Sequence, residues 1–178
     1  AFVRAVAGVR VRFAQAGPGR TVRTEAAEWG GLRARFPDAY GEGPCECVLV
    51  NTGGGMAGGD AYAATFALDE GAQAVVTTQA AEKIYRSDGP DTVVSSAITL
   101  GARSSLVWAP QEAILFSRAR LARTLVIDMA ADASLIACES VYFGRAAMGE
   151  TLADVAFTDR WRVRRAGRLI FADDVRME

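Results

Sequence analysis

Alternating apolar and polar positions run along much of the chain and predict β-strands. Beyond residue 60, several short stretches show a period of two and are bounded by turns that contain Gly, Asp or Ala. This is the period of a strand with one buried face. The predicted strands are Ala74–Thr78, Asp91–Thr99, Ser105–Trp108, Leu121–Ile127, Ser134–Cys138 and Trp161–Val163. Helix signals are few, and the best is Gln79–Tyr85, which would form one or two turns.

Three consecutive units beyond residue 60 repeat the same order of features, with a spacing of about thirty residues. Each unit has a turn, a strand, a polar residue and then an aromatic residue. The turns lie at 69–72, 100–102 and 131–133, the polar residues are Gln79, Gln111 and Glu139, and the aromatic residues are Tyr85, Phe116 and Phe143. Such a repeat predicts a mainly β fold with strands stacked in a helical, solenoid-like arrangement and few short helices.

The two ends of the chain predict additional strands. Residues 1–12 carry an arginine every few positions, which breaks the apolar core that a signal peptide needs, so we expect an edge strand there. Residues 15–45 are expected to form loops with one or two edge strands. Near the C-terminus, residues 165–168 predict the turn of a hairpin. The preceding strand places Arg160, Arg162 and Arg164 on one face, which we interpret as solvated.

Five glycines lie within Asn51–Asp60, a density expected where the backbone needs positive φ or close approach. Gly53, Gly55 and Gly58 also match the G-x-G-x-x-G of dinucleotide-binding enzymes. That function requires a helix directly after the glycines. Residues 61–68 are compatible with a short helix capped by Asp60 or with a strand, so a nicotinamide-dependent enzyme stays an alternative. No Lys-Ser/Thr pair follows the glycines, which excludes a P-loop.

Composition narrows the class of protein. The chain has 178 residues, of which 51% are hydrophobic and 23% charged, which predicts a single globular domain over residues 1–178. The formal net charge of −1 argues against partners bound through overall charge, such as nucleic acid or anionic lipid. No apolar run reaches the length of a membrane span, so we expect a cytoplasmic protein.

The chain contains no histidine, which excludes Ser-His-Asp and Cys-His catalysis and histidine-ligated zinc within it. The three cysteines are Cys45, Cys47 and Cys138. Their spacing does not match a structural zinc site, so reduced thiols are expected.

Four segments together resemble the signatures of the urease accessory protein UreD family, also called UreH. In chain order they are Asn51–Asp60, Thr77–Ser87, Trp108–Phe116 and Glu139–Glu150. The resemblance covers roughly residues 9–176. Family members usually continue past the position of Glu178, so residues 1–178 are expected to form a single UreD-like domain that lacks the C-terminal part of the family.

The resemblance implies a non-enzymatic scaffold and metal conduit in urease maturation. The implied partners are UreF, the GTPase UreG and the urease apoprotein, in a hetero-oligomer. The implied cargo is nickel in transit, with no tightly bound cofactor, and the implied fold is mostly β with strands arranged helically. A route that releases nickel favours weak oxygen ligands, because imidazole and thiolate hold this metal more firmly.

The candidate site residues follow from these motifs. The glycine-rich signature comprises Asn51, Gly53, Gly54, Gly55, Gly58, Gly59 and Asp60. Candidates for the conduit or for partner contacts are Thr78, Gln79, Glu82, Lys83, Tyr85, Arg86, Gln111, Glu112, Glu139, Gly144, Arg145, Gly149 and Glu150. Asp60 and Glu139 are expected as transient metal ligands. A further alternative is a β-solenoid hydrolase with Glu112 and Glu139 as a carboxylate pair on neighbouring coils.

Overall fold

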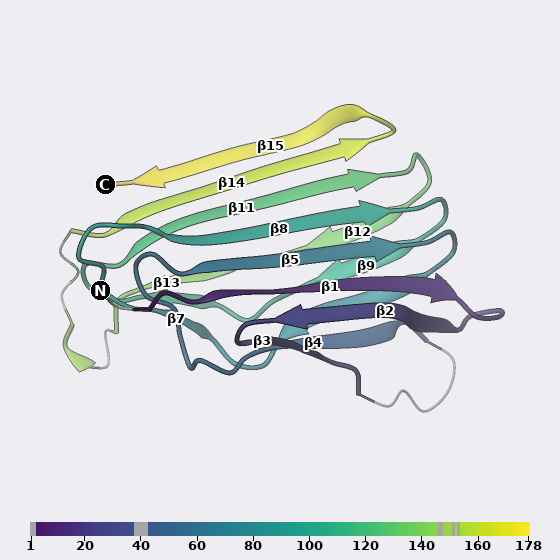
Figure 1. Ribbon diagram of the computed structural model, residues 1–178. Helices are drawn as coiled ribbons and strands as arrows, with labels where there is room; N and C mark the ends of the chain where they lie inside the picture. Colours follow the sequence, from purple (N-terminus) through teal and green to yellow (C-terminus); the bar gives the residue numbers. More distant parts are fainter. Residues whose placement is uncertain (1–2, 38–42, 146–147, 151, 153) are drawn as a thin grey trace.

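The computed structural model describes residues 3–37, 43–145, 148–150, 152 and 154–178, and strands make up most of this part (Figure 1). The mainly β prediction is therefore confirmed. The strands are β1 (Val6–Gln15), β2 (Thr21–Trp29), β3 (Leu32–Arg35), β4 (Cys45–Asn51), β5 (Ala61–Leu68), β6 (Gln73–Thr78), β7 (Glu82–Ile84), β8 (Thr92–Leu100), β9 (Ser105–Trp108), β10 (Ala113–Leu115), β11 (Arg120–Met129), β12 (Ser134–Ala137), β13 (Val141–Phe143), β14 (Ala156–Arg165) and β15 (Arg168–Met177).

The three repeat units are three coils of a solenoid. The coils are β5-β6-β7, β8-β9-β10 and β11-β12-β13, and equivalent strands of successive coils pair in parallel. Each coil gives one strand to each of three sheets, with orders β15-β14-β11-β8-β5-β1-β2, β12-β9-β6-β4-β3 and β13-β10-β7. Figure 1 shows this stacking. The predicted solenoid-like arrangement is confirmed.

The aromatic residues of the three coils are not all equivalent. Leu115 lies opposite Ile84 on one side and Phe143 on the other. Phe143 is therefore one position out of step with Tyr85 and Phe116. It packs against Phe157 with ring centroids 5.8 Å apart, whereas Tyr85 and Phe116 pack against each other at 5.2 Å.

The first strand is not the edge strand that the arginine spacing predicted. β1 lies between β2 and β5, and its inward side chains Ala7, Val9, Val11 and Phe13 are fully buried. Its arginines lie on the opposite face, which made it resemble an edge. The true edges of two sheets are β2 and β3, as expected for residues 15–45, and the predicted hairpin is β14-β15.

Both short helices considered from the sequence are wrong. Residues 61–68 form β5, where Tyr62, Ala64, Phe66 and Leu68 alternate inward between β1 and β8. Residues 82–84 form β7. Backbone pairing of β5 with β1 and β8, and of β7 with β10, outweighs the i, i+4 spacing of Tyr62 and Phe66.

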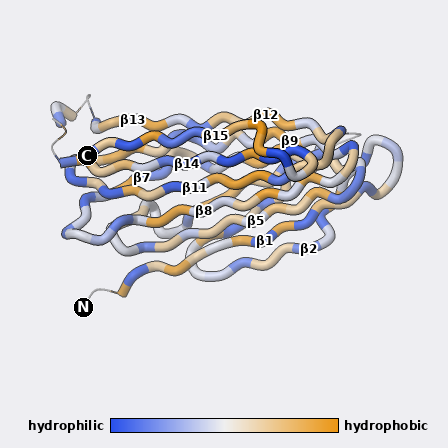
Figure 2. Tube along the Cα trace, turned by 90° about the horizontal axis from the view of Figure 1, so that it is seen from above, coloured by the Kyte–Doolittle hydropathy of each residue, from blue (hydrophilic) through white to orange (hydrophobic). Residues whose placement is uncertain are grey.

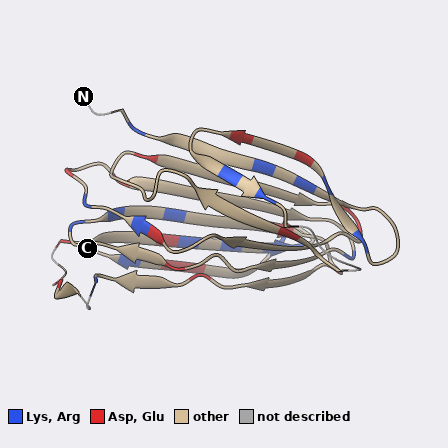
Figure 3. Cartoon of the chain, turned by 90° about the horizontal axis from the view of Figure 1, so that it is seen from below, with Lys and Arg blue, Asp and Glu red and all other residues tan. Residues whose placement is uncertain are grey.

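The core lies between the sheets. The rings of Phe13, Phe66 and Trp108 form a continuous series, with centroid distances of 6.5 and 5.7 Å. Figure 2 shows hydrophobic and hydrophilic positions alternating along the strands that enclose this core. Basic and acidic positions are interspersed in Figure 3, in keeping with the small net charge. Among the described residues, no helix is both long and apolar enough to span a bilayer.

Candidate functional site

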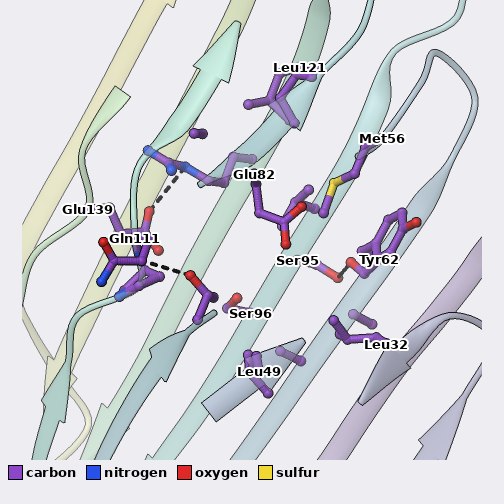
Figure 4. A pocket seen from close by; sticks show the side chains of 18 of the residues that line it. Leu32, Leu49, Met56, Tyr62, Glu82, Ser95, Ser96, Gln111, Leu121 and Glu139 are labelled. Carbon is purple, nitrogen blue, oxygen red and sulfur yellow. Dashed lines mark hydrogen bonds and ion pairs between the residues drawn. The ribbon is translucent and has the colours of Figure 1, made fainter. Parts of the chain in front are cut away.

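A cavity of about 100 Å³ lies between the sheets, and all three coils contribute to its walls. Much of its lining is apolar and includes Leu49, Met56 and Trp108. The polar side chains in its wall are Thr78, Glu82, Ser95, Ser96, Gln111, Arg123 and Glu139 (Figure 4). Four of these, Thr78, Glu82, Gln111 and Glu139, are residues that the sequence singled out. The fold thus brings two carboxylates from distant parts of the chain to one cavity.

Glu82 enters the cavity from β7. Its carboxylate accepts a hydrogen bond of 3.0 Å from the side-chain amide of Asn51, at the end of β4. Burial raises the pKa of Glu82 above its ordinary value, and the hydrogen bond from Asn51 opposes this shift. Among the described residues, Glu82 forms no ion pair.

Glu139 follows β12, next to the buried Trp108 at the end of the paired strand β9. Its side chain is only 5% exposed, and its Oε1 accepts a hydrogen bond of 2.8 Å from Trp108 Nε1. Its Oε2 lies 3.1 Å from Arg123 Nε but receives no hydrogen bond. Burial raises the pKa of Glu139, while the charge of Arg123 and the Trp108 hydrogen bond oppose the shift.

Arg123 and Asp159 complete this cluster, and neither was predicted as a site residue. Asp159 on β14 lies directly opposite Arg123 on β11. Arg123 donates to Asp159 through Nε at 3.1 Å and Nη2 at 2.5 Å. A signal was present in the sequence. Arg123 lies two residues from each of the apolar Leu121 and Leu125, which are buried, so all three side chains share the inward face of the strand.

The glycine-rich segment builds the loop that leads into β5. Gly54 and Gly59 have φ of +74° and +89°, which favour glycine. Gly58 is required for space, since a Cβ there would lie 2.0 Å from Ser87 Oγ. Asp60 is 8% exposed, and its two oxygens accept backbone N–H groups of Ala5 and Ala57, each at 2.8 Å. Asp60 thus fastens the start of β1 to this loop.

The remaining candidates lie outside the cavity. Lys83, Tyr85 and Arg86 are exposed, and the Tyr85 hydroxyl donates to the Gly54 carbonyl at 3.2 Å. Gln79 is exposed and Glu112 half-buried, and neither lines the cavity. The hydrolase pair of Glu112 and Glu139 therefore does not share this space.

Apart from Glu139, the described residues of the last signature do not line the cavity, and those around Arg145 form a turn. Gly144 and Gly149 have φ of +76° and +67°. Between them, Arg145 pairs with Glu150 at 3.0 Å and stacks over the Phe116 ring at 4.1 Å. Glu150 also accepts the backbone N–H of Ser117. Two residues of this signature, Ala146 and Ala147, lie outside the described residues.

Two of the three thiols, those of Cys45 and Cys47, are poor metal ligands in this fold. All three cysteines are free, as expected from the sequence. Burial raises the pKa of the Cys47 thiol to about 12, and burial also raises the pKa of Cys45. A thiol with a raised pKa is not a thiolate at neutral pH. In the part of the chain that the structure describes, no group of three Cys, Asp or Glu side chains could hold a metal ion.

The comparisons with known proteins agree on one family. The sequence model of the UreD urease accessory protein family matches residues 5–178. Urease accessory protein UreD 1 of Methylobacterium radiotolerans is 51% identical over 173 residues, covering 96% of this chain and 59% of the relative. UreD 2 of Methylorubrum populi is 49% identical over 173 residues (96% and 58%). UreD of Rhodopseudomonas palustris strain HaA2 is 50% identical over 169 residues (94% and 60%).

These relatives also bear on the kind of function. Their names describe accessory proteins and not enzymes, as the resemblance predicted. The chain spans less than two thirds of their length.

Proposed function

Because the chain belongs to the UreD family of urease accessory proteins, we propose that it is a non-enzymatic urease maturation factor. It serves as a scaffold with UreF and UreG in the cytoplasm, and as a conduit through which nickel passes to the urease apoprotein. Nickel is cargo in this proposal, and no tightly bound cofactor is involved.

The observation that carries the proposal is the cavity between the sheets, where Glu82 and Glu139 present buried carboxylates. Carboxylates bind nickel less firmly than imidazole or thiolate, which suits release. The cavity also presents hydroxyl and amide oxygens from Ser95, Ser96 and Gln111. Since no cysteine lines the cavity and the chain has no histidine, oxygen is the ligand type that the cavity presents.

The two alternative functions have less support. A dinucleotide site needs a helix after Gly58, and the chain forms β5 there. A carboxylate-pair hydrolase needs two carboxylates on one substrate, but Glu139 is bound by Trp108 and Glu112 does not line its cavity.

Nickel content of urease tests the proposal. Cells would express urease, UreF, UreG and the full-length protein with Glu139→Ala or Glu82→Ala, and purified urease would be assayed for nickel. We expect the complex with UreF to form while nickel per urease falls. Exposed Glu25→Ala on β2 is the matched control. Urease with its full nickel content in both cavity variants would contradict the conduit.

A further inference from the structure

We propose that Arg123 lies beside Glu139 in the position that a cation occupies when it passes through the cavity. Asp159 holds Arg123, so that Arg123 can leave Glu139 when the cation binds there. The inference rests on the proposed conduit and assigns two further residues to it. Arg123 and Asp159 are positioning residues in this proposal, because they act on the cation through Glu139.

The cluster carries an uncompensated negative charge. Arg123 lies 3.1 Å from Glu139 and 2.5 Å from Asp159, and the side chains are 11%, 5% and 11% exposed respectively. One guanidinium therefore serves two buried carboxylates. Removing carboxylates from water without full compensation is costly, so this part of the cavity favours an additional cation.

The contacts of Arg123 with the two carboxylates are not equally strong. Arg123 makes two hydrogen bonds to Asp159, in the forked geometry that gives strong, directional pairs. Its contact with Glu139 Oε2 is close but is not a hydrogen bond. The contact of Arg123 with Glu139 is therefore the one that breaks when a cation competes for Glu139.

The positions of the two carboxylates agree with this difference in strength. Glu139 lines the cavity and Asp159 does not. When a cation binds Glu139, Arg123 keeps its partner in Asp159, so neither buried charge is left alone during the exchange. Such an exchange favours rapid uptake and release over storage.

The chemistry of the cavity identifies the cation class. Glu139 and Glu82 supply carboxylate oxygens, and within the described part of the chain the side-chain partner of Glu82 is the amide of Asn51. A volume of about 100 Å³ corresponds to roughly three water molecules. These features suit a partly hydrated divalent cation.

Nickel titration of substituted complexes tests the inference. Ni²⁺ alone would be titrated calorimetrically into the full-length protein in complex with UreF. Asp159→Asn leaves Glu139 as the only carboxylate partner of Arg123, so we expect affinity to fall about tenfold. Arg123→Gln removes the guanidinium that competes with the cation and leaves both carboxylates without this counter-ion, so we expect affinity to rise. Exposed Asp174→Asn, which loses its pairs with Arg160 and Arg162, should change nothing.

The nickel affinity is expected to fall in Asp159→Asn and to rise in Arg123→Gln. Structural damage would instead lower the affinity of both variants, so the two explanations can be distinguished. Asp159→Glu restores the carboxylate and should restore binding. If Arg123→Gln does not fold, Asp159→Asn and its rescue carry the test, and loss without rescue contradicts the inference. Unchanged affinities, or shifts in the same direction, also overturn it while leaving the conduit intact. Wild-type complex that takes up no nickel overturns the conduit and the inference together.

Discussion

At the scale of single residues, the cavity carboxylates differ from ordinary surface glutamates because burial disfavours their charged forms. Glu82 and Glu139 both have pKa values raised by burial, and each is held by a nitrogen donor from a different coil or strand. The glycines of the Asn51–Asp60 segment have a separate, structural reason, because three of them have positive φ and Gly58 needs space.

Replacing Glu82 by glutamine should stabilise the protein in a pH-dependent way. A glutamate with a raised pKa in the folded state costs stability as pH rises from the usual carboxyl range through that raised value. Glu82→Gln keeps an acceptor for Asn51 and removes this cost. Urea unfolding should therefore show little difference from wild type at low pH and a growing advantage for Glu82→Gln towards neutral pH. Exposed Glu25→Gln is the control. A wild type that is the more stable protein at neutral pH would refute the prediction.

The glycine positions should differ in their tolerance of alanine. Gly58→Ala forces a Cβ against Ser87 and should cost about 1–3 kcal/mol through overpacking. Gly54→Ala has open space but a φ of +74°, and should cost about 1–2 kcal/mol. Gly43→Ala, with open space and no positive φ, is the neutral control. Chemical denaturation measures all three, and equal stabilities would show that the segment is an ordinary turn.

At the scale of elements, the coils could be predicted from the sequence because each repeats its turn, strand and polar residue locally. The position of β1 could not, since its arginines face outward and its partner β5 lies some fifty residues away. The cavity was predicted only in part. Glu82 and Glu139 were recognised as polar residues near strands, but Arg123 and Asp159 acquire their role only through the pairing of β11 with β14.

Asp60 gives a test at this scale, because it was predicted as a metal ligand and the structure shows it binding two backbone N–H groups. Asp60→Ala leaves both groups without their acceptor, which should cost about 2–4 kcal/mol. We expect hydrogen exchange to accelerate at Ala5, at Ala57 and along the start of β1. Loss of nickel transfer with unchanged exchange and stability would favour the metal role instead.

At the scale of the whole molecule, apolar side chains remain exposed along the last hairpin. Leu169, Ile170 and Phe171 of β15 are each close to half exposed, at 48%, 49% and 48%. Exposed apolar side chains combined with a net charge of −1 offer little repulsion between copies.

We therefore expect residues 1–178 expressed alone to self-associate at neutral pH. Light scattering over a concentration series should show growing mass, and co-expression with UreF should raise the soluble yield. A monodisperse monomer at high concentration would show that no large partner surface is missing.

The proposed function depends on the cavity as the path of nickel, and filling the cavity tests this most directly. Ala64 on β5 lines it, whereas Ala26 on β2 is exposed, so Ala64→Leu and Ala26→Leu form a matched pair. Full-length proteins with either change would be co-expressed with UreF, UreG and urease, and co-purification with UreF would confirm folding. We predict that nickel per urease falls well below the wild-type content with Ala64→Leu and stays unchanged with Ala26→Leu. Urease with its full nickel content despite the filled cavity would contradict the conduit.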